Sequence, residues 1–202
     1  MIQKLTIIVL GAFFSLTGCS VLGPVETPTI NIYTLNIPAS DLKITYPMRE
    51  KTLLVSATQA NPELQSTDMI YAQRAYELKS FARNRWAAPP ASMFSALLPQ
   101  YLTEHGCFRA VVSPPFIGNT DWTLQTRLLT LQQVFEKDSS TIELNMEMTL
   151  LDNRTHQIIA HQMIDTKVPA TENNPYAGVV AANRATQIML QKMVNLACPL
   201  NF

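Results

Sequence analysis

Cysteine, histidine and glycine are scarce in this 202-residue chain, which contains three, three and six of them respectively. The cysteines form no Cys-x-x-Cys pair, so their spacing gives no indication of a metal site. The few glycines form neither a phosphate-binding loop nor a Gly-x-Ser-x-Gly motif. Basic and acidic residues number 15 each, and this balance argues against a nucleic-acid partner, which would need a basic face.

The chain also has no apolar run of about 20 residues. Its longest apolar run lies at the N-terminus. Residues 5–16 are apolar apart from Thr6 and Ser15, and they follow the positive charge of Lys4. A run of about a dozen residues is too short to cross a bilayer, which needs roughly 20, so a signal peptide is favoured over a transmembrane anchor.

A lipobox ends this run, at Leu16-Thr17-Gly18-Cys19. Lipoprotein processing alkylates such a thiol and then cleaves after the small residue before it. We therefore expect residues 1–18 to be a lipoprotein signal peptide and Cys19 to become the acylated first residue. Two or three acyl chains would give stable anchoring, where one would be marginal. The alternative is an ordinary signal peptide with a chance cysteine.

The residues after the lipobox suggest a location and a domain division. Ser20 stands where an inner-membrane lipoprotein of enteric bacteria would carry Asp, which favours the outer membrane, on its periplasmic face. We expect residues 19–30 to be a flexible tether and residues 31–202 to form one periplasmic domain. Because Lys4 is the only charge in residues 1–18, the mature chain would keep 14 basic and 15 acidic residues.

The periodicity of apolar residues predicts an α+β domain. Alternation is clearest over 142–150, where apolar residues occupy every second position. One helix should run from Pro90 to Gly106, and another should start at Asn174 and end at Cys198. Further strands are expected at 32–35, 52–57, 107–112, 121–135 and 156–168, the fourth with a bulge. We predict a mostly antiparallel sheet with two main helices packed on one face, in a single domain.

Residues 69–85 fit two patterns. A hairpin is favoured because Tyr76, Leu78 and Ser80 alternate with charged residues and aromatics are frequent; one helix is the alternative. Aromatic and arginine side chains together are typical of partner interfaces. We therefore expect a contact surface here, formed by Tyr71, Tyr76, Phe81, Arg85 and Trp86. The alternative is an edge hairpin whose aromatics simply pack on the sheet.

Cys107 and Cys198 would remain after processing, each just past the end of a predicted helix. An oxidising periplasm makes them a candidate disulfide, with two buried free thiols as the alternative.

No catalytic group emerges from the remaining polar residues. His156 and His161 are five positions apart on one predicted strand and would point to opposite faces, while His105 suits a helix C-terminus. Glu143 and Glu147 share a face, but it is the solvated face of the sheet. We expect no enzyme activity, no metal and no cofactor.

The order of several short motifs resembles one known family. These motifs are the lipobox, Tyr33-Thr34-Leu35, Tyr71-x4-Tyr76 leading to Asn84-Arg85-Trp86-Ala87 and Pro90, Trp122 through Leu128 to Phe135, and Leu150-Leu151-Asp152. In this order and spacing they are similar to the ABC-type transport auxiliary lipoproteins, in particular the paraquat-inducible protein C type. One turn differs: relatives often have Asp-x-x-x-Gly where this chain ends in His156.

The resemblance implies a non-catalytic, membrane-anchored component of an ABC lipid transport system that links inner and outer membranes. Its implied partner is a periplasmic protein with mammalian-cell-entry (MCE) domains, and the lipoprotein itself is expected to form a homo-oligomer. The alternative function is an envelope lipoprotein that scaffolds or activates a cell-wall or secretion machine.

Overall fold

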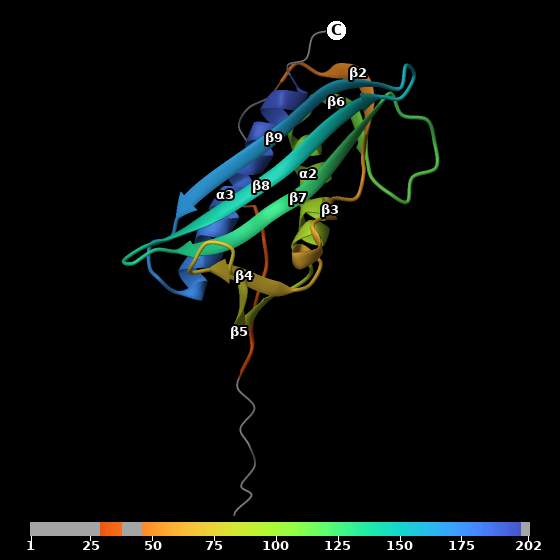
Figure 1. The fold of residues 1–202 in the computed structure, drawn as a ribbon. Helices are drawn as coiled ribbons and strands as arrows, with labels where there is room; N and C mark the ends of the chain where they lie inside the picture. The colour runs from red at the N-terminus through yellow and green to blue at the C-terminus, as the bar shows by residue number, and fades with distance from the viewer. Residues whose placement is uncertain (1–28, 38–45, 199–202) are drawn as a thin grey trace, which may run out of the picture.

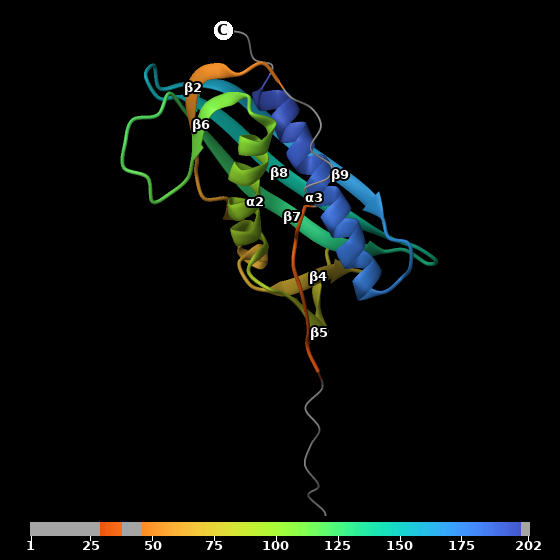
Figure 2. The same cartoon turned by 180° about the vertical axis from the view of Figure 1, so that it is seen from behind.

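The computed structural model of the protein describes residues 29–37 and 46–198. The expected signal peptide, Cys19 and residues 19–28 of the expected tether lie outside the described residues, so the boundaries 1–18, 19–30 and 31–202 stay predictions. Two helices lie on one face of a curled sheet, and the other face of the sheet is open (Figures 1 and 2). Neither helix in the described part of the chain is both long and apolar enough to cross a membrane.

Residues 29–37 and 46–198 form two helices, a short 3-10 turn and nine strands. In chain order they are β1 (Asn31–Tyr33), β2 (Arg49–Val55), β3 (Gln59–Ala60), η2 (Pro62–Leu64), β4 (Asp68–Ala72), β5 (Lys79–Trp86), α2 (Pro90–His105), β6 (Phe108–Val112), β7 (Trp122–Phe135), β8 (Ser140–Asp152), β9 (Gln157–Pro169) and α3 (Pro175–Ala197). The predicted helices and longer strands are all present, whereas β3 and η2 were not predicted.

The long strands β7, β8 and β9 form an antiparallel meander. The alternating apolar residues of β8 are buried beneath α3, because one face of the meander carries the helices and the other faces solvent. The expected bulge is confirmed: the β7–β8 register shifts between Leu128 and Thr130. It re-phases the strand, so that Leu128 and Leu131 are both buried.

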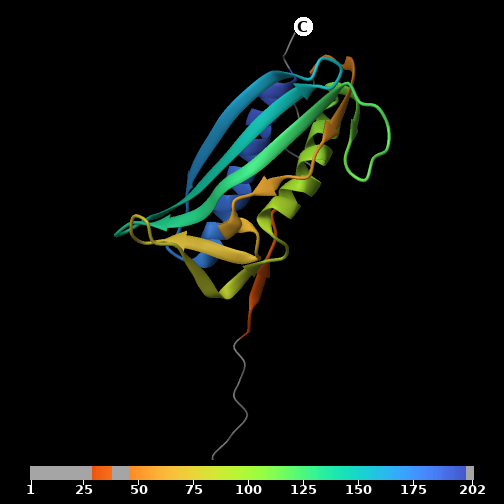
Figure 3. The same cartoon turned by 45° about the vertical axis from the view of Figure 1, so that its right-hand side comes forward.

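The opposite edge of β7 is shared by three separate segments (Figure 3). In order along β7 they are β2, β3 and β4, and all three run parallel to it. Strand β6 continues the sheet beyond β2, while β5 and then β1 continue it beyond β4. The α+β class, the single domain and the placement of both helices are therefore confirmed. The sheet is mixed: antiparallel pairing forms the longest ladders, but connections that include α2 return the chain in the same direction and produce parallel pairs.

The ambiguous segment is a hairpin, as favoured from the sequence. Strands β4 and β5 pair in antiparallel fashion, with Ile70 opposite Ser80 and Tyr71 opposite Lys79.

The helix ends also follow the sequence signals. The Asn174 side chain accepts a hydrogen bond from the Ala177 N–H at 2.8 Å, and Gly106 ends α2 with a left-handed φ of 65°.

The Cys107–Cys198 disulfide is confirmed, with a Cα–Cα distance of 5.7 Å. It joins the start of β6 to the end of α3, and both sulfurs are buried. Arg49 binds both cysteines: its backbone N–H donates to the Cys107 carbonyl at 3.0 Å and its Nε donates to the Cys198 carbonyl at 3.0 Å. The guanidinium carbon also lies 5.6 Å from the centre of the Trp122 ring. The bridge thus belongs to a packed cluster that fixes one end of α3.

A buried amide holds the other end of α3. Gln133 Nε2 donates to Ser140 Oγ at 2.9 Å and to the Asn174 carbonyl at 3.2 Å. Its Oε1 faces Gly178, where an added Cβ would lie only 2.1 Å away. Glycine is needed at this helix position because any side chain would displace the amide.

Removing the disulfide should destabilise the domain. The bridge closes a loop with a sequence separation of 91, and bridges of this kind contribute about 2–5 kcal/mol. We expect the Cys107→Ala/Cys198→Ala variant to unfold at lower urea concentration than the oxidised wild type. Adding reductant should leave the unfolding midpoint of this variant unchanged. An oxidised wild type whose stability is unaffected by reductant would contradict the bridge.

Gly178→Ala should destabilise the domain by about 1–3 kcal/mol, because overpacking at this site displaces the buried Gln133 amide. In a Gln133→Ala background the same substitution should instead stabilise by up to about 1 kcal/mol, since alanine is the better helix former. Urea unfolding of the four proteins in this double-mutant cycle measures the effect. If Gly178→Ala changed stability in the same direction in both backgrounds, the contact between position 178 and the Gln133 amide would not be the cause of the destabilisation.

Candidate functional site

The most exposed aromatic residue of the domain lies in the turn between β4 and β5, residues 73–78, which we name the Tyr76 turn. Tyr76 is fully exposed at 107% of its reference area, and its backbone has a left-handed φ of 66°. That conformation costs an L-residue about 1–2 kcal/mol, and such strain tends to persist at functional positions. Leu78 in the same turn is also exposed.

A hollow of about 270 Å³ lies between the Tyr76 turn and the open face of the sheet. The sheet contributes Gln132, Val134, Phe135 and Glu143 to its lining. In the turn, Glu77 Oε1 pairs with Lys79 Nζ at 3.1 Å, whereas its shielded Oε2 has no hydrogen-bond partner among the described residues. The hollow therefore offers mainly apolar surface, and the shielded Glu77 oxygen is not open to a partner in this conformation.

Three aromatic rings form the base of the turn. Tyr71 stacks on Phe81 with centroids 4.5 Å apart, and Phe135 meets them edge-on at 5.8 and 6.2 Å. Aromatic pairs of this geometry contribute about 0.5–1.5 kcal/mol beyond their buried area. Tyr71 and Phe81 are half-buried. Their contacts with Phe135 hold the hairpin to β7.

Arg85 and Trp86 have structural contacts. Arg85 Nε pairs with Asp68 Oδ1 at 3.2 Å across the hairpin, and its guanidinium also donates to the Phe81 and Asn84 carbonyls. Trp86 is only 5% exposed and belongs to the hydrophobic core. The expectation that Trp86 contributes to a contact surface needs correction: its ring is packed inside, so a partner could not reach it without local unfolding.

The five expected contact residues therefore belong to one hairpin and its turn but differ in availability. Tyr76 is free to meet a partner, Tyr71 and Phe81 support the turn, Arg85 fixes the hairpin, and Trp86 anchors it. The sequence did not indicate the hollow or the exposure of Leu78. Alternation placed Leu78 in a strand, and only the position of the turn over β7 and β8 brings Val134 and Glu143 beneath it.

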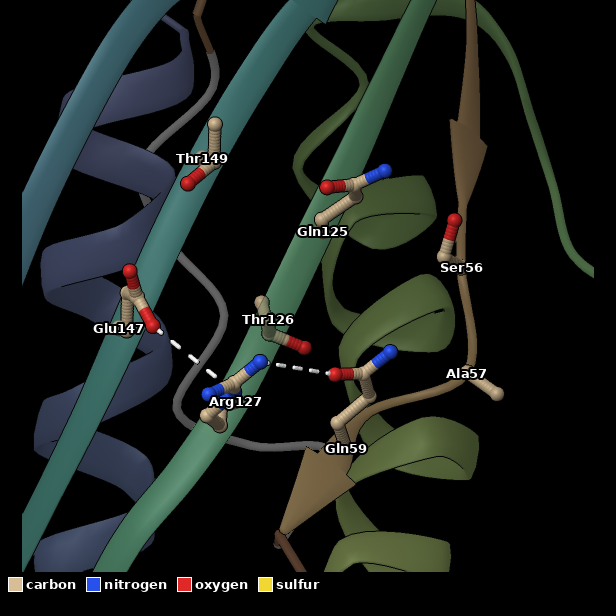
Figure 4. A pocket seen from close by; sticks show the side chains of 8 residues that line it. All are labelled: Ser56, Ala57, Gln59, Gln125, Thr126, Arg127, Glu147 and Thr149. Atoms are coloured by element: carbon tan, nitrogen blue, oxygen red, sulfur yellow. Dashed lines mark hydrogen bonds and ion pairs between the residues drawn. The ribbon is translucent and has the colours of Figure 1, made fainter.

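A second, polar hollow of about 260 Å³ lies where β2 and β3 separate from β7 (Figure 4). Arg127 Nη2 donates to Gln59 Oε1 at 3.2 Å, and its Nε lies 4.0 Å from a Glu147 oxygen. The other Glu147 oxygen is 3.8 Å from His161 Nε2. These groups are largely exposed, so the ion pairs contribute little to stability. The hollow has the features of a solvated sheet face.

The two carboxylates considered from the sequence do not act as a pair. Glu143 binds Lys167 at 2.6 Å and accepts from Gln132, whereas Glu147 is engaged by Arg127 and His161. The hydrogen bond from Lys167 lowers the pKa of Glu143, and in turn Glu143 raises the pKa of Lys167. Glu143 is therefore kept ionised by Lys167, which does not suit a proton donor, and Glu147 contacts other partners instead of Glu143.

The histidines are also dispersed. His105 is buried in α2, with Nδ1 2.8 Å from the Tyr101 carbonyl, while His161 lies on the open face of β9. His156 was expected on that strand but lies in the turn before it, with a left-handed φ of 58°. Nowhere in residues 29–37 and 46–198 do three His, Cys, Asp or Glu side chains gather to hold a metal.

Comparison with protein families gives a clear result. The family described as "ABC-type transport auxiliary lipoprotein component" matches residues 33–194, nearly all of the described domain. The chain belongs to this family. Its members are auxiliary lipoproteins of the envelope, and the resemblance seen in the sequence is confirmed. No curated protein matches the chain.

Solved structures share the fold of this auxiliary lipoprotein. Protein XCC0632 from Xanthomonas campestris has a TM-score of 0.74 at 16% identity, over 83% of this chain and 94% of its own. Protein CT253 from Chlamydia trachomatis has a TM-score of 0.54 at 8% identity, over 73% of this chain and 95% of its own. Identity this low shows a common fold alone.

Trp86 and Tyr76 should respond oppositely to truncation. Trp86→Ala removes a core ring and should cost about 3–5 kcal/mol of unfolding free energy. Tyr76→Gly removes only exposed surface and relieves a left-handed residue, so stability should be unchanged or rise by up to about 1 kcal/mol. Urea unfolding followed by circular dichroism measures both. A Trp86→Ala protein as stable as wild type would contradict the core assignment.

Proposed function

We propose that this auxiliary lipoprotein is a non-catalytic component of an ABC transport system that moves lipid between the inner and outer membranes. Its periplasmic partner in this proposal is an MCE-domain protein. The observation that carries the proposal is the family match over residues 33–194, together with the lipobox that ends at Cys19. A lipid anchor attaches a protein stably to a membrane, which is suited to a component that holds a larger assembly there.

A non-catalytic role is supported by the arrangement of the polar residues. The acids on the open face each bind a separate cation, and the buried histidine His105 hydrogen-bonds to its own helix. One hydroxyl of the polar hollow does face a base: Thr149 Oγ1 lies 3.0 Å from His161 Nδ1, and His161 Nε2 lies 3.8 Å from Glu147. The His161 side chain is half exposed on the solvated face of the sheet. This group therefore lacks the water-excluded setting that activates a hydroxyl nucleophile.

Anchoring through acylated Cys19 in the outer membrane is part of the same proposal, supported by the lipobox and by Ser20 after it. Residues 19–30 would connect the anchor to the domain. Self-association is also proposed, because β9 pairs only with β8 among the described strands. The free edge of a 13-residue strand invites pairing with another chain.

The Tyr76 turn is our proposed contact for the MCE-domain partner. It combines the exposed aromatic side chain of Tyr76, the adjacent exposed Leu78 and a hollow between the turn and the sheet. The Tyr71–Phe81–Phe135 rings hold this surface in one conformation, which lowers the entropy lost on binding. Arg85 and Trp86 act indirectly, by fixing the hairpin.

Affinity purification of the tagged, lipidated protein from its native membranes tests the proposal. We expect an MCE-domain protein and its ATPase to co-purify, and Tyr76→Ala to reduce their recovery at least tenfold, the loss expected for an aromatic residue that dominates an interface. The matched control is Ile117→Ser, which removes another fully exposed apolar side chain, in the loop between β6 and β7.

Unchanged recovery with Tyr76→Ala would remove the turn from the interface while leaving the partnership intact. Recovery of a cell-wall synthase or a secretion channel in place of the transporter would overturn the function and favour the scaffold alternative.

A further inference from the structure

The point at which the chain enters the domain is fixed by β1. This strand pairs in parallel with β5, with Asn31 beside Asn84 and Tyr33 beside Trp86. The Asn31 side chain donates to Asn84 Oδ1 at 3.2 Å, and the Ala87 N–H donates to the Tyr33 carbonyl at 2.6 Å. Strands β1 and β5 lie together at one end of the molecule (Figures 1 and 3). We name this the tether end.

The segment after β1 is fastened to α3. The backbone N–H of Asn36 donates to Asn183 Oδ1 at 2.7 Å, and Asn183 Nδ2 donates back to the Thr34 carbonyl at 3.2 Å. The Tyr33 ring lies 6.1 Å from that of Tyr176, in the first turn of α3. These contacts fix residues 29–37 on the domain, and the first described residue, Thr29, lies at the tether end.

The sequence keeps this end close to a lipid at Cys19. Thr29 follows Cys19 by ten positions. A trans polypeptide extends at most about 3.3–3.6 Å per residue, so the span is limited to roughly 35 Å. A surface held this near a bilayer meets it at a high effective concentration, and weak contacts then become populated.

The side chains at the tether end suit a lipid surface. Ile30 and Ile32, just before and within β1, are 54% and 68% exposed. Tyr176 is 62% exposed, and its ring lies beside that of Tyr33 in the same strand. Arg83 is exposed on β5 and forms no ion pair with any described residue. Aliphatic and aromatic side chains enter the headgroup layer, and arginine binds phosphate there while its stem covers apolar surface.

We propose that the tether end, defined by Ile30, Ile32, Arg83 and Tyr176, docks onto phospholipid headgroups. The proposal rests on the acylation of Cys19 in the proposed function and deepens it by assigning the domain one orientation. The tether end lies against the bilayer, and the loop between β6 and β7, at the far end of the sheet, is directed away from it (Figure 1). A protein partner for the tether end is the competing occupant.

Fluorescence in vesicles can test this orientation on the mature, lipidated chain. With Cys19 acylated and Cys107 bridged to Cys198, an introduced cysteine is the only free thiol. Ile32→Cys and the control Ile117→Cys would each carry an environment-sensitive NBD label. Both proteins would be reconstituted in phosphatidylethanolamine–phosphatidylglycerol vesicles, with and without brominated acyl chains. Vesicle flotation reports the anchor, and quenching by bromine reports docking.

We expect both proteins to float, with emission at position 32 rising at least twofold on reconstitution and being quenched by brominated lipid. Emission at position 117 should change little. Adding Arg83→Glu to the Ile32→Cys protein should reduce quenching without reducing flotation, because only the headgroup contact is lost.

Three results would overturn the proposal. Flotation with equal responses at positions 32 and 117 would refute docking alone and leave the anchor standing. Failure to float would refute the anchor, and docking with it. A rise in emission at position 32 that appears only after addition of the purified MCE-domain protein, without quenching by brominated lipid, would assign the tether end to that protein instead of to lipid.

Discussion

Strand β7 holds the two halves of the sheet together, because segments from both halves pair with it. On one edge it forms a continuous antiparallel ladder with β8, and on the other it accepts β2, β3 and β4 in succession. The bulge after Leu128 allows both halves of this long strand to bury apolar residues beneath the helices. Without that change of phase, one half of the strand would turn its apolar side chains to solvent.

The two ends of α3 show how the helices are fastened to this frame. At one end the disulfide and Arg49 join the helix to β6 and β2. At the other end the buried Gln133 amide bonds the Asn174 cap, and Gly178 leaves room for it. A helix held at both ends keeps β1 and the hairpin β4–β5 in place, so the Tyr76 turn and the tether end occupy defined positions relative to each other.

Much of the fold could be predicted because its signals are local. The alternation over Ile142–Leu150, the Asn174-Pro175 start and the Gly106 stop each depend on neighbouring residues, and each is present in the structure. The parallel pairs of β2, β3 and β4 with β7 could not be predicted. Pairing between strands distant in the chain depends on how α2 returns the backbone, and no local pattern encodes that.

The same division holds for the functional surface. The lipobox at Cys19 and the family resemblance could be identified from the sequence, which also favoured a hairpin over a helix for residues 69–85. The burial of Trp86 and the exposure of Tyr76 depend on the folded domain. Both are aromatic residues in one hairpin, so their local patterns are equivalent. Burial is set by what packs against each ring: Trp86 faces the core beneath the helices, whereas Tyr76 lies in a turn that nothing covers.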